Sequence, residues 1–407
     1  MSSLQPALPY KYPRVFWIMC LGAMSFFLSF NIILPELAQE LRSKGGAAYV
    51  GWIIPAFSFS ALIARPFSGW ITDNLGRRWA MIGGCLFCII AGCFYPMVTT
   101  AMGFLIVRAI HGFSTGFTPT GFTAFTADVV AESHRGRAMG WQGMFNNLGT
   151  TIGYALGAVI ALHFGVDILY YTSAALASLA WLLFMSLPET RTKSNRKECV
   201  FNIRNLFYFP AWRPSFIMFL VCISLGSILT VMADFTLEMG YTNKGLFLSI
   251  YIGVSLLFRL ISGRVSDALG RAWSTAIGTA AQVLSMSILV YMSIRLNHLH
   301  QTDCAACELP GLIWFASSAI LYGIGQGFNA PSLFAWASDT ADNHHRGRAL
   351  AMLFMFLELG IIVGGLTANY FIKGMSWNYV GIFGLSGSAF LIALGFSLYC
   401  LRYQHQK

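Results

Sequence analysis

Apolar stretches of about 20 residues alternate with short polar segments along almost the whole chain. An α-helix rises about 1.5 Å per residue, so a stretch of this length crosses a hydrocarbon core of about 30 Å. Backbone groups find no water in lipid, so each stretch is predicted to be a helix. We expect twelve helices, at residues 15–37, 50–72, 79–98, 101–127, 138–163, 167–187, 213–236, 246–267, 273–295, 310–337, 348–372 and 377–400. The pattern predicts an all-α polytopic membrane protein.

The composition and the placement of charge agree with this interpretation. Of the 407 residues, 56% are hydrophobic and 10% are charged, whereas soluble domains average roughly 45–50% and about 25%. The net charge of +10 does not indicate nucleic-acid binding, because Lys and Arg concentrate in alternate loops. Eighteen lie in the set of loops that includes both termini, and five lie in the opposite set. The positive-inside rule therefore predicts that both termini are cytoplasmic.

Two polar phrases each occur twice. GWITDNLGRR at 69–78 returns as GRVSDALGRA at 263–272, 194 residues later. SHRGRAMG at 133–140 returns as HHRGRALA at 344–351, 211 residues later. A tandem repeat in a membrane protein is typical of transporters whose two halves surround a central site.

The repeat also predicts the domain organisation. We expect a first six-helix bundle at 1–187, a basic cytoplasmic linker at 188–212 and a second six-helix bundle at 213–407.

Taken together, these motifs and the twelve stretches resemble the major facilitator superfamily. The phrase at 69–78 fits the family signature Gly-x3-Asp-x2-Gly-Arg-Arg/Lys, and LPET at 187–190 matches the Pro-Glu-Thr that often ends the sixth helix. RAIHGFSTG at 108–116 is similar to the fourth-helix pattern, with His111 where Gln is usual. The chain looks like bacterial drug and sugar efflux permeases. It has Gly153-Tyr154 where the antiporter signature has Gly-Pro, which weakens the case for export.

The resemblance implies a monomeric secondary transporter with the two-bundle major facilitator fold, in a bacterial-type inner (plasma) membrane. We expect alternating access and proton-coupled export of a small organic molecule. Import or facilitated passage of a nutrient, such as a sugar, an organic acid or a metallophore, is the alternative. A sensor that has lost transport and a membrane-embedded enzyme are further alternatives. The sequence has no clustered nucleophile and no nucleotide-phosphate loop, so no enzymatic activity, cofactor or ATP-driven pumping is expected.

A cytoplasmic gate is also implied by the resemblance. Gly69 and Gly76 are expected to let the backbone approach a neighbour or bend, and Asp73 is expected to pair with a nearby Arg. The charge network would join the two halves and bias the outward-open state against the inward-open state. In the alternative, Asp73 caps a helix and the Arg residues only anchor the topology. The expected gate residues are Gly69, Asp73, Gly76, Arg77, Arg78, Asp128, Arg137, Asp267 and Arg271.

Five ionisable side chains lie inside the apolar stretches, where a charge is costly: Arg65, Arg108, Asp234, Arg259 and Glu358. Arg65 and Arg259 each precede the glycine of a repeated motif by four residues. This favours a shared structural role near the cytoplasmic ends, where long side chains reach water. Asp234 lies near the outer end of the seventh stretch, where it is a candidate for substrate binding or coupling, or is simply hydrated.

Arg108 has no charged counterpart, because the matching residue of the second half is Ala319. His111 lies one turn further on the same helical face. Arg108 could bind an anionic group or serve as counter-ion to a carboxylate; alternatively it is bonded to backbone carbonyls of a neighbouring helix. Amides within the stretches can join helices or line a substrate path, so Asn31, Asn147, Gln326 and Asn329 are weaker candidates.

Glu358 is the strongest candidate for proton coupling. It lies near the middle of the eleventh stretch, and its counterpart in the first half is Asn147. A neutral acid is cheap to bury, so protonation and deprotonation could follow the exposure of Glu358 to each side. The alternatives are a permanent hydrogen-bond donor between helices and a direct contact with substrate.

The loop NHLHQTDCAACE contains His298, His300, Cys304 and Cys307. This spacing could bind zinc, the two Cys could form a disulfide, or the loop is an ordinary one. Nothing else in the sequence suggests a metal site, so no metal is expected.

Overall fold

The computed structural model describes residues 11–131, 134–190, 208–302, 311–340, 346–374 and 379–404. Cys304 and Cys307, for which zinc and a disulfide were considered, lie outside the described residues, as does most of the linker 188–212.

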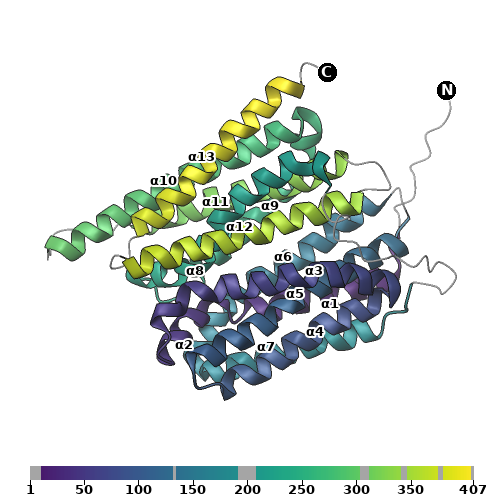
Figure 1. Cartoon of the computed structure of the whole chain (residues 1–407), viewed down its shortest axis with the longest axis horizontal. Coiled ribbons are helices and arrows are strands. Elements are labelled where there is room, and N and C mark those ends of the chain that lie inside the picture. Colours follow the sequence, from purple (N-terminus) through teal and green to yellow (C-terminus); the bar gives the residue numbers. More distant parts are fainter. Residues whose placement is uncertain are drawn as a thin grey trace.

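In its described part, the first half of the chain has six long helices. They are α1 (Arg14–Asn31), α3 (Ile53–Asn74), α4 (Arg77–Phe94), α5 (Ala101–Val129), α6 (Arg135–Phe164) and α7 (Val166–Met185). The short helix α2 (Leu37–Ser43), between the 3-10 turns η1 (Leu34–Glu36) and η2 (Ala47–Trp52), joins α1 to α3. Helix α2 lies at the opposite end of the molecule from the two chain termini (Figure 1). We call these ends the far end and the terminal end.

The described part of the second half also has six long helices. They are α8 (Trp212–Glu238), α9 (Leu246–Leu269), α10 (Arg271–Thr302), α11 (Leu312–Asp339), α12 (Arg346–Gly374) and α13 (Tyr379–Gln404). Ten helices of the described chain are long and apolar enough to cross a membrane, namely all the long ones except α5 and α11. These two have 29 and 28 residues and pack between neighbours within their bundles. The expected twelve helices are therefore present, although hydropathy alone identifies ten.

Both bundles follow one packing plan. In the first, α5 packs against α3 and α4, α1 against α6, and α7 against both α1 and α4. In the second, α11 packs against α9 and α10, α8 against α12, and α13 against both α8 and α10. The halves meet through α3 against α12 and through α6 against α9, and the repeat also relates these two contacts (Figure 1). The repeat in the sequence is thus a repeat in three dimensions.

Glycine sets the closest helix contacts. A Cβ built on Gly112 of α5 would collide with the carbonyl oxygen of Phe57 on α3, and one on Gly323 of α11 would collide with that of Tyr251 on α9. The two glycines are 211 residues apart, whereas Phe57 and Tyr251 are 194 apart. The two contacts are therefore equivalent: one partner is related by the offset of 211 and the other by the offset of 194. Lipid tails are as apolar as leucine, so close packing by small residues is a main source of helix association in membranes.

Two glycines at equivalent positions make the short turns that end α3 and α9. Gly76 has φ +131° and Gly270 has φ +94°, conformations that side chains with a Cβ rarely adopt. Each next helix begins at the following residue, Arg77 or Arg271. The bend expected of Gly76 is present.

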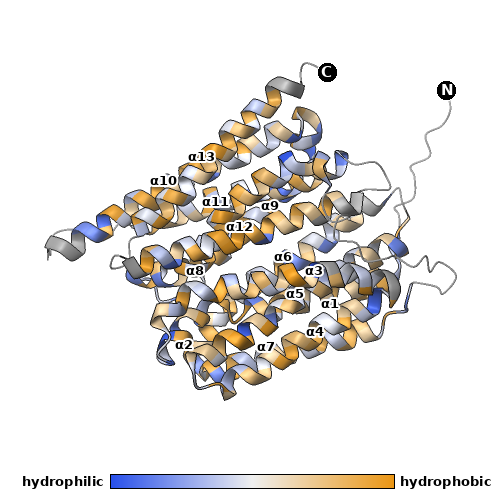
Figure 2. Ribbon diagram, in the orientation of Figure 1, coloured by the Kyte–Doolittle hydropathy of each residue, from blue (hydrophilic) through white to orange (hydrophobic). Residues whose placement is uncertain are grey.

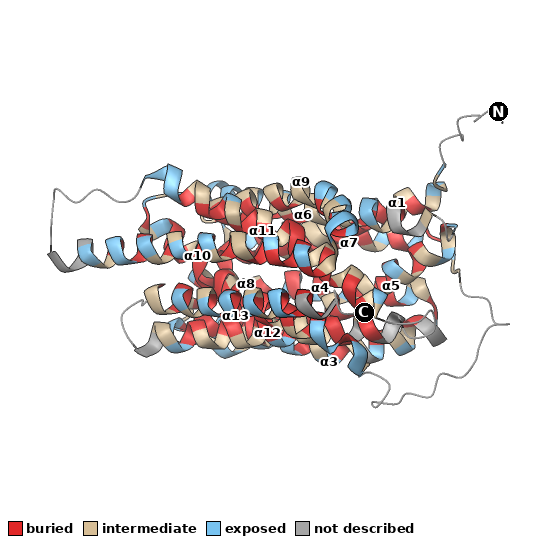
Figure 3. Ribbon diagram, turned by 90° about the horizontal axis from the view of Figure 1, so that it is seen from above, coloured by how far each residue is buried: buried red, intermediate tan, exposed pale blue. Residues whose placement is uncertain are grey.

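Hydrophobic residues cover the helices along most of their length, and hydrophilic residues gather mainly toward the ends (Figure 2). Buried positions lie where helices face one another, and exposed positions lie on the outer faces (Figure 3). Large apolar side chains such as Phe59, Leu260 and Leu284 are more than half exposed. Soluble monomers rarely expose apolar patches of this extent, so the outer surface suits lipid.

Replacement of Gly112 or Gly323 by Ala should destabilise the protein. The new methyl group would press on the backbone of the next helix, and overpacking costs about 1–3 kcal/mol. The apparent Tm of each purified variant in detergent should fall by several degrees. Gly83→Ala on α4 is the control, because a Cβ there meets nothing within 4 Å. Equal Tm values for Gly112→Ala and Gly83→Ala would contradict the close contact.

Candidate functional site

An ion pair in the interior joins the two halves. The Nη2 atom of Arg65 on α3 lies 2.9 Å from Oε1 of Glu358 on α12, and the two side chains are 15% and 7% exposed. The guanidinium also lies over the ring of Phe354, 4.4 Å from its centroid. Removal of one partner from a buried ion pair leaves an uncompensated charge, at a cost of about 3–5 kcal/mol. The pair therefore holds α3 against α12.

This geometry bears on two interpretations from the sequence. Arg65 was expected to reach water at a helix end. Instead, its side chain turns toward the opposite half. Glu358 accepts a hydrogen bond from Arg65 through Oε1, so in this contact it joins two helices as an acceptor. The sequence did not reveal that Arg65 and Glu358 are partners.

Two further ion pairs between the halves lie at the far end, among the described residues. Arg42 donates from Nη1 and Nη2 to the two carboxylate oxygens of Asp234, at 2.5 and 2.6 Å. Lys244 donates from Nζ to Oε2 of Glu36 at 2.5 Å. Arg42 and Glu36 belong to the first half, and Asp234 and Lys244 to the second. Each half thus supplies one acid and one base, and we call these four residues the far-end closure.

Backbone packing tightens the same end. A Cβ on Gly51 of η2 would overlap Asn369 of α12, and one on Gly245 would overlap the carbonyl oxygen of Tyr154 on α6. Asp234 is therefore neither simply hydrated nor in a central site, because it lies within a closed contact between the halves.

Toward the terminal end, three glycines of these helices make no close contact with the described residues. A Cβ on Gly69 of α3, Gly140 of α6 or Gly263 of α9 would meet nothing within 4 Å. Gly69 therefore does not permit a close approach in this conformation, contrary to expectation. The halves are thus in close contact at the far end, whereas these three positions show no such contact.

The first copy of the repeated motif binds within its own half. Arg77 donates from Nε to Asp128 at 3.0 Å and from Nη1 to the carbonyl of Thr72 at 2.7 Å. The carboxylate of Glu189 accepts from the backbone N–H groups of Arg77 and Arg78, at 2.9 and 3.1 Å. These N–H groups begin α4, where the helix dipole favours an anion.

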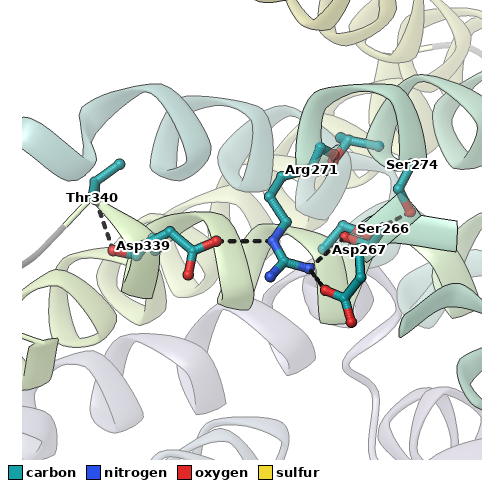
Figure 4. A network of polar contacts seen from close by, with 9 residues as sticks. Ser266, Asp267, Arg271, Ser274, Asp339 and Thr340 are labelled. Carbon is teal, nitrogen blue, oxygen red and sulfur yellow. Dashed lines mark hydrogen bonds and ion pairs between the residues drawn. The ribbon is translucent and has the colours of Figure 1, made fainter. Parts of the chain in front are cut away.

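The second copy repeats this arrangement in the other half (Figure 4). Arg271 donates from Nε to Asp339 at 2.9 Å, and from Nη1 to Asp267 at 2.5 Å and to Ser266 at 3.0 Å. Asp339 is the counterpart of Asp128, 211 residues on. The sequence reasoning missed it, although that offset applied to Asp128 identifies it.

The expected cytoplasmic gate therefore differs from what is seen. Arg77 with Asp128, and Arg271 with Asp267 and Asp339, each connect helices of one half, whereas the expectation joined the halves. The side chains of Asp73 and Arg137 lie outside the described residues. In the described part of the chain these networks rigidify the two bundles separately.

Arg108 and His111 lie in the core of the first half. Arg108 is 1% exposed, donates from Nε to the carbonyl of Ile53 at 3.4 Å, and lies 4.1 Å from the ring centroid of Phe57. His111 lies between the Cys88 thiol and the Tyr95 hydroxyl, at 3.3 and 3.4 Å. The carbonyl contact matches the structural alternative for Arg108, and no carboxylate of the described residues pairs with it.

The four candidate amides have different surroundings. Asn31 and Asn329 join helices of one half: Asn31 donates to Thr150 at 3.3 Å, and Asn329 donates to Gln282 at 2.6 Å. They lie in bundle cores, which matches the first of the two roles expected of such amides, joining helices, rather than the second, lining a substrate path. Gln326 is half-buried and lies 3.4 Å from the Tyr322 hydroxyl. Asn147 differs, because its buried Nδ2 has no hydrogen-bond partner in the described chain.

The chain is similar to known transporters in sequence. The sequence model described as Major Facilitator Superfamily matches residues 15–299 and 214–406. Multidrug resistance protein 2 of Bacillus subtilis is 27% identical over 403 residues, which cover 94% of each chain. The staphylopine export protein of Staphylococcus aureus is 23% identical over 394 residues, which cover 93% of this chain and 94% of that protein.

Solved structures share the fold. That of PepTSo, a POT family transporter, matches with a TM-score of 0.76 at 13% identity and covers 98% of this chain and 100% of that one. That of the human organic anion transporter MFSD10 (TETRAN) matches with a TM-score of 0.71 at 18% identity and covers 94% and 99%. The expected twelve-helix, two-bundle fold is confirmed.

Asp234→Asn should open the far end. The change leaves Arg42 without its bidentate partner, and hydrogen bonds to charged groups contribute about 1.5–3 kcal/mol. The closed form should lose roughly ten- to a hundredfold in population relative to the open form. A cysteine at Val50, which lines a cavity of about 10 Å³ between η2, α3 and α8, should then react faster with a membrane-impermeant maleimide.

Glu40→Gln is the matched control for this experiment, because Glu40 pairs with Lys44 of its own half at 2.8 Å. An unchanged labelling rate in Asp234→Asn would show that the ion pair does not hold the far end closed.

Proposed function

Because the chain belongs to the major facilitator superfamily, whose sequence model matches it almost throughout, we propose that it exports a small organic molecule in exchange for protons. As a member of this family it is a secondary transporter in a membrane. We further propose that it acts as a monomer in the plasma membrane, with both termini in the cytoplasm and no enzymatic activity. Relatives named as a multidrug resistance protein and a staphylopine export protein support export.

The observation that carries the coupling is the interior pair of Arg65 and Glu358. Proton binding at Glu358 would neutralise the acid and remove the attraction that holds α3 against α12. Release of the proton would restore it. Because the two residues belong to opposite halves, the protonation state of one carboxyl group changes the contact between the bundles.

Orientation then gives the conformational cycle. The terminal end carries the excess of Lys and Arg in the sequence, so by the positive-inside rule it faces the cytoplasm. The far-end closure is then on the outer side, and the conformation described here faces inward. Residues 1–187 and 213–407 would move as two units joined by the linker 188–212, opening and closing the two ends alternately.

Inward-facing loading and outward protonation suit export. A molecule would enter between the halves from the cytoplasm while Glu358 is paired with Arg65. Opening of the outer side would separate Arg42 from Asp234 and Lys244 from Glu36, and would admit protons from outside. Binding of a proton by Glu358 then keeps α3 and α12 apart until the proton leaves on the cytoplasmic side.

Glu358→Gln should uncouple transport from protons. The amide keeps the shape and can still accept from Arg65, but it cannot ionise. A transported compound is first identified by a thermal-shift screen of sugars, organic acids, metallophores and cationic drugs. Proteoliposomes that contain pyranine should then show no substrate-dependent proton flux for the variant, while exchange of labelled substrate survives.

Glu40→Gln serves as the control, because it removes an acid whose ion pair lies within one half. Proton flux with an unchanged pH dependence in Glu358→Gln would refute the coupling role.

A further inference from the structure

The repeat places Arg259 on α9 where Arg65 stands on α3. The two residues are 194 positions apart, and α9 meets α6 as α3 meets α12. Arg259 therefore faces the first half across the second of the two contacts between the bundles. Its Nη1 lies 3.9 Å from the position that a Cβ on Gly143 of α6 would take.

The partners found by Arg65 are missing at this second contact. Phe354, whose ring lies against Arg65, corresponds to Gly143, and Glu358 corresponds to Asn147, both 211 positions earlier. The first difference removes an aromatic ring, and the second removes a negative charge. Gly143 and Asn147 are four residues apart on α6, so both differences lie on one face of that helix.

Arg259 is left without an anion in the described part of the chain. Its guanidinium makes no hydrogen bond or ion pair there, and its Nε is buried without a partner. The Nδ2 of Asn147 is also buried and unpartnered. A charge at membrane depth needs a counter-charge or water. The donors of Arg259 and Asn147 call for a negatively charged acceptor, and the glycine in place of Phe354 leaves room for a ring.

We propose that this place binds the transported molecule, and that the molecule is an aromatic carboxylate. Its carboxylate would accept from the guanidinium of Arg259, an arrangement that favours bidentate hydrogen bonds, and from the amide of Asn147. Its ring would take the room that Phe354 fills at the equivalent contact. This proposal rests on the proposed transport function and names the substrate class.

Access to the place is from the terminal end. Gly140 on α6 and Gly263 on α9 lie within about one turn of Gly143 and Arg259, and a Cβ on either would meet nothing within 4 Å. Toward the far end the same two helices close, because a Cβ on Gly245 would overlap the carbonyl oxygen of Tyr154. An occupant would therefore enter from the proposed cytoplasmic side, as an exported molecule must.

Binding can be measured without transport. Equilibrium dialysis of the purified full-length protein in nanodiscs would compare radiolabelled 2-naphthoate with 2-naphthamide, which has the same ring but no charge. The wild type should bind naphthoate more tightly than naphthamide. Arg259→Gln should weaken naphthoate binding about tenfold or more, because a charge-assisted pair is lost, and should leave naphthamide binding unchanged. Arg264→Gln, an exposed position on the same helix, should bind as the wild type does.

A second variant keeps Arg259 and tests the same place if Arg259→Gln does not fold. Asn147→Glu supplies the acid found at the equivalent contact, so it should raise the apparent Tm and abolish naphthoate binding. Gly143→Phe with Asn147→Glu should rebuild the whole arrangement of Arg65, Phe354 and Glu358, with the same result.

The proposal is overturned if the wild type binds naphthoate no more tightly than naphthamide, or if Asn147→Glu binds naphthoate as the wild type does. Because the assay contains no pH gradient, such a failure leaves the coupling role of Glu358 standing. Conversely, if naphthoate binding depends on Arg259 but the proton-flux experiment refutes the coupling role of Glu358, the proposed binding place stands and the proposed coupling fails.

Discussion

A charged side chain at membrane depth must be paired or hydrated. Arg65 and Glu358 meet this requirement by pairing with each other, and the arrangement of the two halves depends on that pair. Neither residue finds its partner within its own half, so the two bundles satisfy the constraint by meeting along α3 and α12. Arg108 meets the same requirement differently, with a backbone carbonyl and the ring of Phe57 inside one bundle. Pairing between the halves is therefore a property of a few positions, and those positions are the ones that movement must disturb.

The repeat separates scaffold from chemistry. Where the halves agree, the contacts are structural: Gly112 and Gly323 pack against equivalent backbones, and the two motif arginines bind equivalent acids. Where the halves disagree, charge is unbalanced. Glu358 in one half, with Asn147 as its counterpart in the other, gives one interface an ion pair and leaves Arg259 at the other interface without an anion among the described residues. A symmetric frame can thus carry two different tasks at its two equivalent contacts.

Most of the fold could be predicted from the sequence, because the length and hydrophobicity of a helix are local properties. The repeat added that both halves should have the same arrangement. The site was less readable. Position along a helix predicted that Arg65 would reach water, but the rotation of α3 turns it toward Glu358, 293 residues away. For Asn329 the sequence left two roles open, joining helices or lining a substrate path, and only the contact with Gln282 in a bundle core decides for the first. Asp339 was within reach of the sequence, because the offset that matched other residues also locates it. Pairings between the halves depend on helix rotation and register, which one sequence does not encode locally.

The far-end closure and the pair of Arg65 and Glu358 both join the halves through ion pairs. At the far-end closure, Arg42 and Asp234 keep 28% and 10% of their side chains exposed, whereas Lys244 and Glu36 keep only 12% and 5%. The interior pair, at 15% and 7%, is about as buried as the second of these pairs, so its separation also leaves charges where water is scarce and attraction is strong. In the proposed mechanism, opening of the far end releases the closure residues to the outer solvent, whereas a proton on Glu358 lowers the cost of parting the interior pair. The proposed connection between proton binding and movement of the halves thus rests on this one pair, because a proton neutralises one of its two charges and the two charges belong to opposite halves.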